Sequence, residues 1–246
     1  MPIENSKTLQ NLALGAERCR QASDKSQSSG FVIDSILNEK LILVIRDVAF
    51  DDLITVAEAV YDGGVRLLEV AFDATGRTTD EETGKMIAHL SMAMKEKMIV
   101  GAGTVLSPRQ VQIAAEAGAL FIISPDANES VITETRTIGL VSIPGAMTPT
   151  EIQRAHLLGA DFVKLFPAGN LGPSYMKAVK TPLSHINLLA VAGIHPENIG
   201  EYLAAGACGF GISSGIVDKN LVAARNFSAI SERAKSYTTA IASYVA

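Results

Sequence analysis

The sequence predicts an α/β fold, a (β/α)8 TIM barrel with an N-terminal helical extension. Three observations support this fold: apolar segments recur at a regular spacing, helical patterns fill the gaps between them, and the helices share start and stop signals. The chain has 246 residues, enough for one large domain. We expect residues 1–30 to form the extension and residues 31–246 to form the barrel domain.

Eight continuous apolar segments have the composition of buried strands. They are Leu41–Arg46, Leu67–Phe72, Ile99–Val105, Leu120–Pro125, Leu140–Gly145, Phe162–Pro167, Leu188–Gly193 and Cys208–Ser213. Strands that are apolar along their whole length are buried on both faces, which is typical of a parallel sheet. Eight such units favour a closed barrel, and the lack of a G-x-G-x-x-G motif after the first segment disfavours a doubly wound open sheet.

The intervening segments carry repeated helix signals. Ser107-Pro108, Thr148-Pro149 and His195-Pro196 each place a proline in the expected first turn of a helix. Glycines follow the expected helix ends, where a left-handed residue is needed before the next strand; they are Gly63-Gly64, Gly118, Gly159 and Gly206. This repetition supports a series of strand–helix units.

Composition limits the classes of partner. The formal net charge is −5, which disfavours nucleic acid or an anionic membrane as the main partner. Cys19 and Cys208 lie far apart and indicate reduced thiols in a cytoplasmic protein. No apolar run approaches the ~20 residues of a membrane span, and the N-terminus does not resemble a secretory signal. The histidines lack metal-ligand spacing, so we expect no metal and no cofactor.

Two charged residues interrupt the apolar strands. Lys164 is expected on the same strand face as Phe162 and Phe166, and Glu69 lies within the second strand. Burial disfavours the charged form of a lysine, and a neutral amine can attack a carbonyl to form a Schiff base. A nearby carboxylate can move protons in such a reaction. The alternative is that the lysine extends to water and the glutamate is a structural ion-pair partner.

The last two strands end in small residues. Gly193 ends the seventh strand and Ile194 follows it, and Gly211, Ser213 and Ser214 lie at the end of the eighth. Barrel enzymes often bind phosphate on backbone N–H groups at the carboxyl ends of these two strands. We therefore expect an anion site there, although glycines in these positions also occur as simple turns.

With these residues in hand, the sequence resembles the family of 2-keto-3-deoxy-6-phosphogluconate (KDPG) and 4-hydroxy-2-oxoglutarate (KHG) aldolases. The matching segments are Gly63–Val70, Val100–Val105, Ile123–Pro125, Ile143–Gly145, Phe162–Ala168 and Ala192–Ile194. They occur in the order typical of the family. The resemblance implies a class I aldolase, a homotrimer that needs no metal.

The resemblance also implies roles for individual residues. Lys164 would form the Schiff base with the keto acid, and Glu69 would move protons. Thr104 would help to hold the carboxylate of the pyruvate half, and Pro144 and Phe166 would line the pocket. The turns that contain the glycines and serines of strands seven and eight would take the phosphate.

One position departs from the family pattern. The family usually has an arginine four residues after the glutamate, and this chain has Asp73 there. A negative charge at that position would repel a keto-acid carboxylate at short range. Arg46, which matches an arginine that many members carry on the first strand, is then expected to bind the carboxylate, with Arg77 as a second candidate.

The predicted function is cleavage of a 2-keto-3-deoxy sugar acid, 6-phosphorylated, to pyruvate and a phosphorylated aldehyde. Three alternatives remain open from the sequence. The first is cleavage of the unphosphorylated dicarboxylate KHG by the same lysine. The second is a phosphosugar isomerase or epimerase on a similar barrel, and the third is a binding barrel without catalytic activity.

Overall fold

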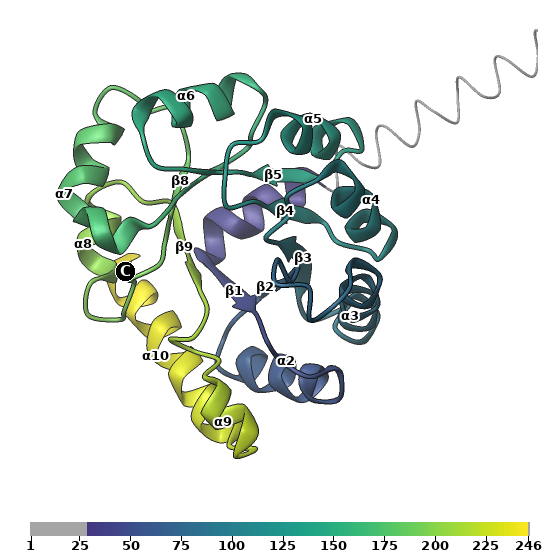
Figure 1. Ribbon diagram of the computed structural model, residues 1–246. Coiled ribbons are helices and arrows are strands. Elements are labelled where there is room, and N and C mark those ends of the chain that lie inside the picture. Colours follow the sequence, from purple (N-terminus) through teal and green to yellow (C-terminus); the bar gives the residue numbers. More distant parts are fainter. Residues whose placement is uncertain (1–28, 246) are drawn as a thin grey trace, which may run out of the picture.

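The computed structural model describes residues 29–245 and contains one closed barrel. Nine parallel strand segments form one sheet in the order β5-β4-β3-β2-β1-β9-β8-β7-β6. The two ends of this order are consecutive in the chain, because β5 and β6 are separated only by Pro144. They therefore act as one broken strand, and the sheet closes into the predicted eight-stranded barrel (Figure 1).

Each predicted strand segment contains an observed strand. The strands are β1 Leu41–Ile45, β2 Leu67–Ala71, β3 Ile99–Gly103, β4 Phe121–Ile123, β5 Val141–Ile143, β6 Gly145–Ala146, β7 Val163–Leu165, β8 Leu188–Val191 and β9 Gly209–Ile212. Buried residues occupy all or nearly all positions of every strand. The continuous apolar character therefore has the predicted cause, which is burial on both faces.

Helices cover the outside of the barrel (Figure 1). They are the 3-10 helix η1 Phe50–Asp52 and the α-helices α2 Leu53–Asp62, α3 Asp80–Ala93, α4 Pro108–Glu116, α5 Glu129–Thr137, α6 Pro149–Leu157, α7 Ala168–Lys180, α8 Ile199–Ala204, α9 Lys219–Ala223 and α10 Phe227–Val245. None of the helices within residues 29–245 is long and apolar enough to cross a membrane.

Side-chain caps explain where several helices begin. Ser107 and Thr148 accept hydrogen bonds from the first-turn N–H groups of α4 and α6, as their sequences predict. The third predicted helix start is different. The side-chain oxygen of Asn198 accepts from the N–H of His195 at 2.9 Å, and this turn delays the start of α8 to Ile199. The Asn198 side chain binds a backbone N–H group in a turn, as asparagine commonly does, and this turn takes the place of the first helical turn.

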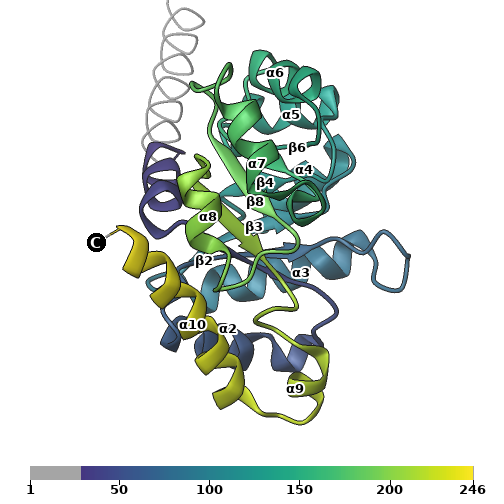
Figure 2. The ribbon, with the colours of Figure 1, turned by 90° about the vertical axis from the view of Figure 1, so that its left-hand side faces the viewer.

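A helix over residues 29–39 closes the end of the barrel where the strands begin. Val32 and Ile36 are fully buried and pack with barrel-interior residues such as Phe121 and Phe162. Figure 2 shows this helix and the loop before α3 at opposite ends of the molecule. The proposed boundary after residue 30 falls inside this helix, and the rest of the predicted extension lies outside the described residues.

We predict that Ile36→Ala destabilises the barrel, because it leaves a cavity beneath the interior cluster. The free energy of unfolding should fall by about 2 to 5 kcal/mol. Phe31→Ala is the matched control on the same helix, since Phe31 is 62% exposed, and it should change stability by less than about 1 kcal/mol. Urea unfolding followed by circular dichroism measures both, and equal effects would contradict the packing of this helix in the barrel.

Candidate active site

A cavity of about 450 Å3 opens at the carboxyl ends of the strands. Most of the predicted site residues line it, namely Arg46, Glu69, Thr104, Lys164, Phe166, Gly193, Ile194, Gly211, Ser213 and Ser214. The sequence did not single out Val44, Pro125, Val191 or Ile212, which also line it. Their position at the carboxyl ends of the strands is the sequence feature from which they could have been predicted to line the cavity.

Lys164 lies in the middle of β7 and is partly buried. Its backbone N–H donates to the carbonyl of Pro144 at 2.9 Å, and its Nζ lies 4.8 Å from the centre of the Phe166 ring. Burial lowers the pKa of Lys164, the Glu69 carboxylate opposes this shift, and Arg46 adds to it. The neutral amine is therefore more populated here than on a lysine in water.

Glu69 lies on β2 and is only 2% exposed. Its Oε2 is buried and accepts no hydrogen bond from any described residue. Burial raises the pKa of Glu69 to about 7, against the opposing attraction of Lys164 and Arg46. Such a carboxyl group exchanges a proton near neutral pH, and its unpartnered oxygen is suited to a water or a substrate hydroxyl.

Gly103 makes room for the Glu69 carboxylate. It pairs with Ala71 in the register between β2 and β3, two residues beyond Gly101, which is the partner of Glu69. A Cβ built at this position would overlap the carboxylate atoms of Glu69. The glycine that ends the Gly-Ala-Gly motif is thus explained by the space that the buried acid needs.

Arg46 follows β1 and reaches across the mouth of the barrel. Its Nη2 donates a hydrogen bond of 2.7 Å to the Oγ1 of Thr104, which follows β3. Thr104 has a left-handed backbone, with φ of 55°. Within residues 29–245, Arg46 forms no ion pair with a carboxylate. The guanidinium is therefore held in place by a neutral partner and keeps its charge for another anion.

The turns after β8 and β9 face the same cavity. The hydroxyl of Ser213 donates to the carbonyl of Val44 at 3.1 Å, which ties the second turn to β1. The backbone N–H groups of Ile194, Ser214 and Gly215 donate to no other described residue. These N–H groups can serve an anionic ligand.

Two positions lie elsewhere than expected. Pro144, expected on the pocket wall, sits in the break between β5 and β6 and does not line the cavity. Asp73 does not line it either. Its carboxylate accepts from the backbone N–H groups of Thr75, Arg77 and Thr78 and from the hydroxyl of Thr75. Hydrogen bonds from Thr75 are the main reason that the pKa of Asp73 falls to about 2.

Metal ligands do not cluster in the described part of the chain: no group of three or more His, Cys, Asp or Glu side chains is arranged to hold an ion. Cys208 is a free thiol whose pKa burial raises to about 12. Cys19 lies outside the described residues. The predicted independence from metals and cofactors remains a prediction.

The fold and the site define a parallel (β/α)8 barrel with a lysine and a carboxyl group inside a cavity at the carboxyl ends of its strands, where barrel enzymes place their active sites. A sequence model of the family described as KDPG and KHG aldolase matches residues 32–233. The chain belongs to this family. It is therefore an aldolase, a lyase.

The relatives that match this chain are named for several different substrates. The chain is 34% identical over 175 residues to 2-dehydro-3-deoxy-6-phosphogalactonate aldolase of Escherichia coli (strain K12). This alignment covers 71% of this chain and 82% of the relative. It is 34% identical over 203 residues to 2-dehydro-3-deoxy-phosphogluconate aldolase of Treponema pallidum (strain Nichols), and the alignment covers 81% of this chain and 92% of the relative. A KHG/KDPG aldolase of Escherichia coli (strain K12) is 33% identical over 75% of this chain and 80% of its own.

Solved structures agree with this family. One described as a native KDPGal structure matches with a TM-score of 0.75 and 30% identity, over 83% of this chain and 95% of its own. The KDPG aldolase from Legionella pneumophila, with pyruvate captured as a covalent carbinolamine intermediate, matches with a TM-score of 0.72 and 28% identity, over 81% and 94%.

We predict that Gly103→Ala lowers aldol-cleavage turnover by roughly 100-fold, because the new methyl group displaces the Glu69 carboxylate. Gly30→Ala is the matched control, since a Cβ there meets no atom of the described residues within 4 Å. Both variants should be assayed with KDPG. Equal turnover of the two variants would show that the fit of Gly103 against the carboxylate has no role in the reaction.

Glu69 should also affect stability with pH. Its pKa is raised from the ordinary value of 4.5 to about 7, so the folded state binds the proton more tightly than the unfolded state. This contribution is fully present below pH 4.5 and is lost as the pH rises to about 7. The free energy of unfolding should fall over this range by up to about 1.4 kcal/mol per pH unit relative to Glu69→Gln. Urea unfolding from pH 4 to 8 measures the difference, and parallel pH curves would contradict it.

Proposed function

We propose that this aldolase cleaves a 2-keto-3-deoxy-6-phospho sugar acid to pyruvate and a phosphorylated aldehyde through a Schiff base on Lys164. The observation that carries the proposal is the pairing inside one cavity of an amine whose pKa is lowered and a carboxyl group whose pKa is raised to about 7. Pairs of titratable groups shifted in this way are the usual acid–base assignments of an active site.

Lys164 begins the reaction as the neutral amine. Its nitrogen attacks the C2 carbonyl of the keto acid, and the carboxylic acid of Glu69 gives the proton with which the C2 oxygen leaves as water. A protonated imine and the Glu69 carboxylate remain. Glu69, as the carboxylate, removes the proton of the C4 hydroxyl, directly or through a water. The C3–C4 bond then breaks, its electron pair moves toward the imine nitrogen, and the aldehyde leaves.

Glu69 also completes the cycle. The remaining enamine takes a proton at C3 from the Glu69 carboxylic acid, which regenerates the imine of pyruvate. Water then adds to C2 and gives a proton to the Glu69 carboxylate, and the resulting carbinolamine breaks down to pyruvate and the neutral amine of Lys164. A carboxyl group with a pKa of about 7 is suited to both directions of proton transfer near neutral pH.

Arg46 and Thr104 hold the carboxylate of the keto acid in this proposal. The guanidinium lines the cavity together with Glu69 and Lys164, and its hydrogen bond to Thr104 orients it. An arginine can form two parallel hydrogen bonds with a carboxylate. Phe166 lines the same cavity beside the lysine and keeps its surroundings apolar.

The phosphate lies on the turns after β8 and β9. The free backbone N–H groups of Ile194, Ser214 and Gly215 support a phosphorylated substrate over the dicarboxylate KHG. The stereochemistry at C4 is a separate choice, since relatives of equal identity act on the gluconate and the galactonate forms by name. Membership of the family supports a cytoplasmic homotrimer, which remains our expectation.

Borohydride trapping tests the Schiff base. After incubation with pyruvate and borohydride, intact mass should show one adduct, and peptide mapping should place it on Lys164. Lys164→Arg should give no adduct and no cleavage, because a guanidinium forms no imine. An adduct on another lysine, or cleavage by the arginine variant, would overturn the assignment to Lys164. The absence of any adduct would favour an isomerase-type or binding barrel.

Substrate comparison tests the phosphate site. We predict that kcat/KM for KDPG or its galactonate epimer exceeds that for KHG by at least about tenfold, because only the phosphorylated acids use the two turns. The two phosphorylated epimers serve as controls for each other. A higher kcat/KM for KHG would identify the dicarboxylate as the substrate.

A further inference from the structure

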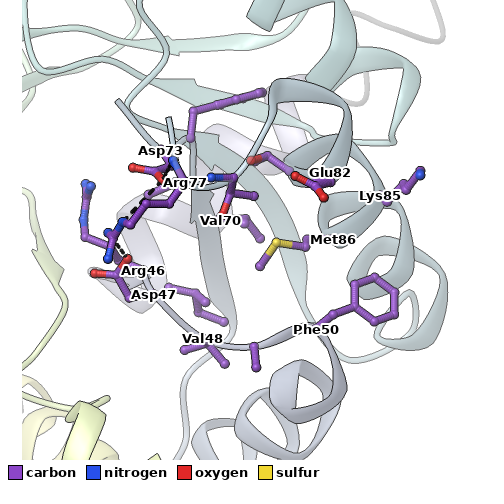
Figure 3. Close-up of a pocket in the computed structure, with 16 residues that line it drawn as sticks. Arg46, Asp47, Val48, Phe50, Val70, Asp73, Arg77, Glu82, Lys85 and Met86 are labelled. Atoms are coloured by element: carbon purple, nitrogen blue, oxygen red, sulfur yellow. Dashed lines mark hydrogen bonds and ion pairs between the residues drawn. The ribbon is translucent and has the colours of Figure 1, made fainter. Parts of the chain in front are cut away.

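Arg46 connects the catalytic cavity with a second one. The second cavity has a volume of about 400 Å3 and lies between the segment after β1, the end of β2, and α3 (Figure 3). Arg46 lines both cavities, whereas Asp47, Asp73 and Arg77 line only the second of these two. The charged groups of the second cavity therefore lie beside the residue that we place on the substrate carboxylate.

Asp73 gives the loop before α3 its shape. Its carboxylate collects the N–H groups of Thr75, Arg77 and Thr78, which folds the chain back over the end of β2. This fold presents the Arg77 side chain toward β1, where its Nη2 forms an ion pair of 2.7 Å with Asp47. Figure 3 shows Arg77 between the two aspartates, next to Arg46.

Asp47 is the carboxylate nearest to Arg46 in the sequence. It follows Arg46 directly and has a left-handed backbone, with φ of 55°. Without a cation of its own, Asp47 would attract the Arg46 guanidinium and repel an incoming keto-acid carboxylate. Arg77 lies near both aspartates: its Nε is 3.7 Å from the Oδ2 of Asp73, and its Nη2 is 2.7 Å from the Oδ1 of Asp47. Asp73 also accepts hydrogen bonds from the loop, whereas Arg77 is the cation that pairs closely with Asp47.

We propose that Arg77 is a positioning residue that neutralises Asp47, so that Arg46 stays available for the substrate carboxylate. The inference rests on the proposed function of Arg46. It explains how this chain tolerates an aspartate where the family usually has an arginine. Asp73 shapes the loop, Arg77 forms the ion pair with Asp47, and the positive charge of Arg46 remains available at the catalytic cavity.

The test measures the pyruvate concentration that gives half-maximal borohydride trapping. Arg77→Gln should raise this concentration about three- to tenfold, the effect of one unscreened charge near the surface, and should leave the extent of trapping at saturation unchanged. Arg77→Lys should retain most of the wild-type value, because the positive charge beside Asp47 is kept. The increase should shrink at high ionic strength.

The double variant Asp47→Asn, Arg77→Gln decides the mechanism. It should return the half-saturating concentration to near the wild-type value, since the Asp47 carboxylate beside Arg46 is removed and Asp73 keeps its hydrogen bonds to the loop. Persistence of the defect would overturn the proposal and show that Arg77 binds substrate or holds the loop. An unchanged value in Arg77→Gln alone would also overturn it.

Arg109→Gln is the matched control. Arg109 pairs with Glu81 at 2.6 Å on the surface, with exposure similar to that of the Arg77 pair, and neither residue lines a cavity described above. It should leave the half-saturating concentration unchanged, and a similar rise in this variant would contradict a local role for Arg77. Failure of the proposed function gives a different result, which is the absence of a trapped adduct on Lys164 in the wild-type protein.

Discussion

The burial of two oppositely charged groups inside a closed barrel is the constraint on which the site depends. Desolvation lowers the pKa of Lys164 and raises that of Glu69, while their mutual attraction works against both shifts. Desolvation is the larger effect on each residue. The same burial that costs stability therefore prepares a nucleophilic amine and a proton carrier at one pH.

Other features of the barrel follow from this constraint. Gly103 has no side chain, which leaves space beside β3 for the Glu69 carboxylate. Arg46 is placed at the mouth with a neutral partner, Thr104, so that its charge remains for the substrate. The turns after β8 and β9 leave backbone N–H groups in the same cavity for a second anion. A substrate that carries both a carboxylate and a phosphate matches these two groups of donors.

The sequence was sufficient for the barrel, because strands buried on both faces are apolar throughout and can be counted. Most of the site was also predictable, since polar residues at strand ends meet at one end of a parallel barrel. Three features were not predictable from the pattern. Asn198 replaces the expected helix start at His195 with a turn, Pro144 occupies a break in a strand, and the helix over residues 29–39 closes the barrel. Each depends on a contact between side chain and backbone, or between distant segments.

Asp73 is a further residue whose contacts could not be predicted from the sequence pattern. Its position in the sequence suggested repulsion of the substrate, but its direction depends on hydrogen bonds to residues 75–78, which a strand pattern does not encode. The structure turns its charge into the loop, away from the catalytic cavity.

Direct titration of Lys164 tests the central claim, that desolvation dominates both groups. Selective isotope labelling of lysine and nuclear magnetic resonance would follow its pKa in the wild-type protein and in Glu69→Gln. The account predicts a pKa below the ordinary value of 10.5 in the wild type, and a lower one in the variant, because the attraction of the carboxylate is lost. A wild-type pKa at or above 10.5 would contradict it, as would a rise in the variant.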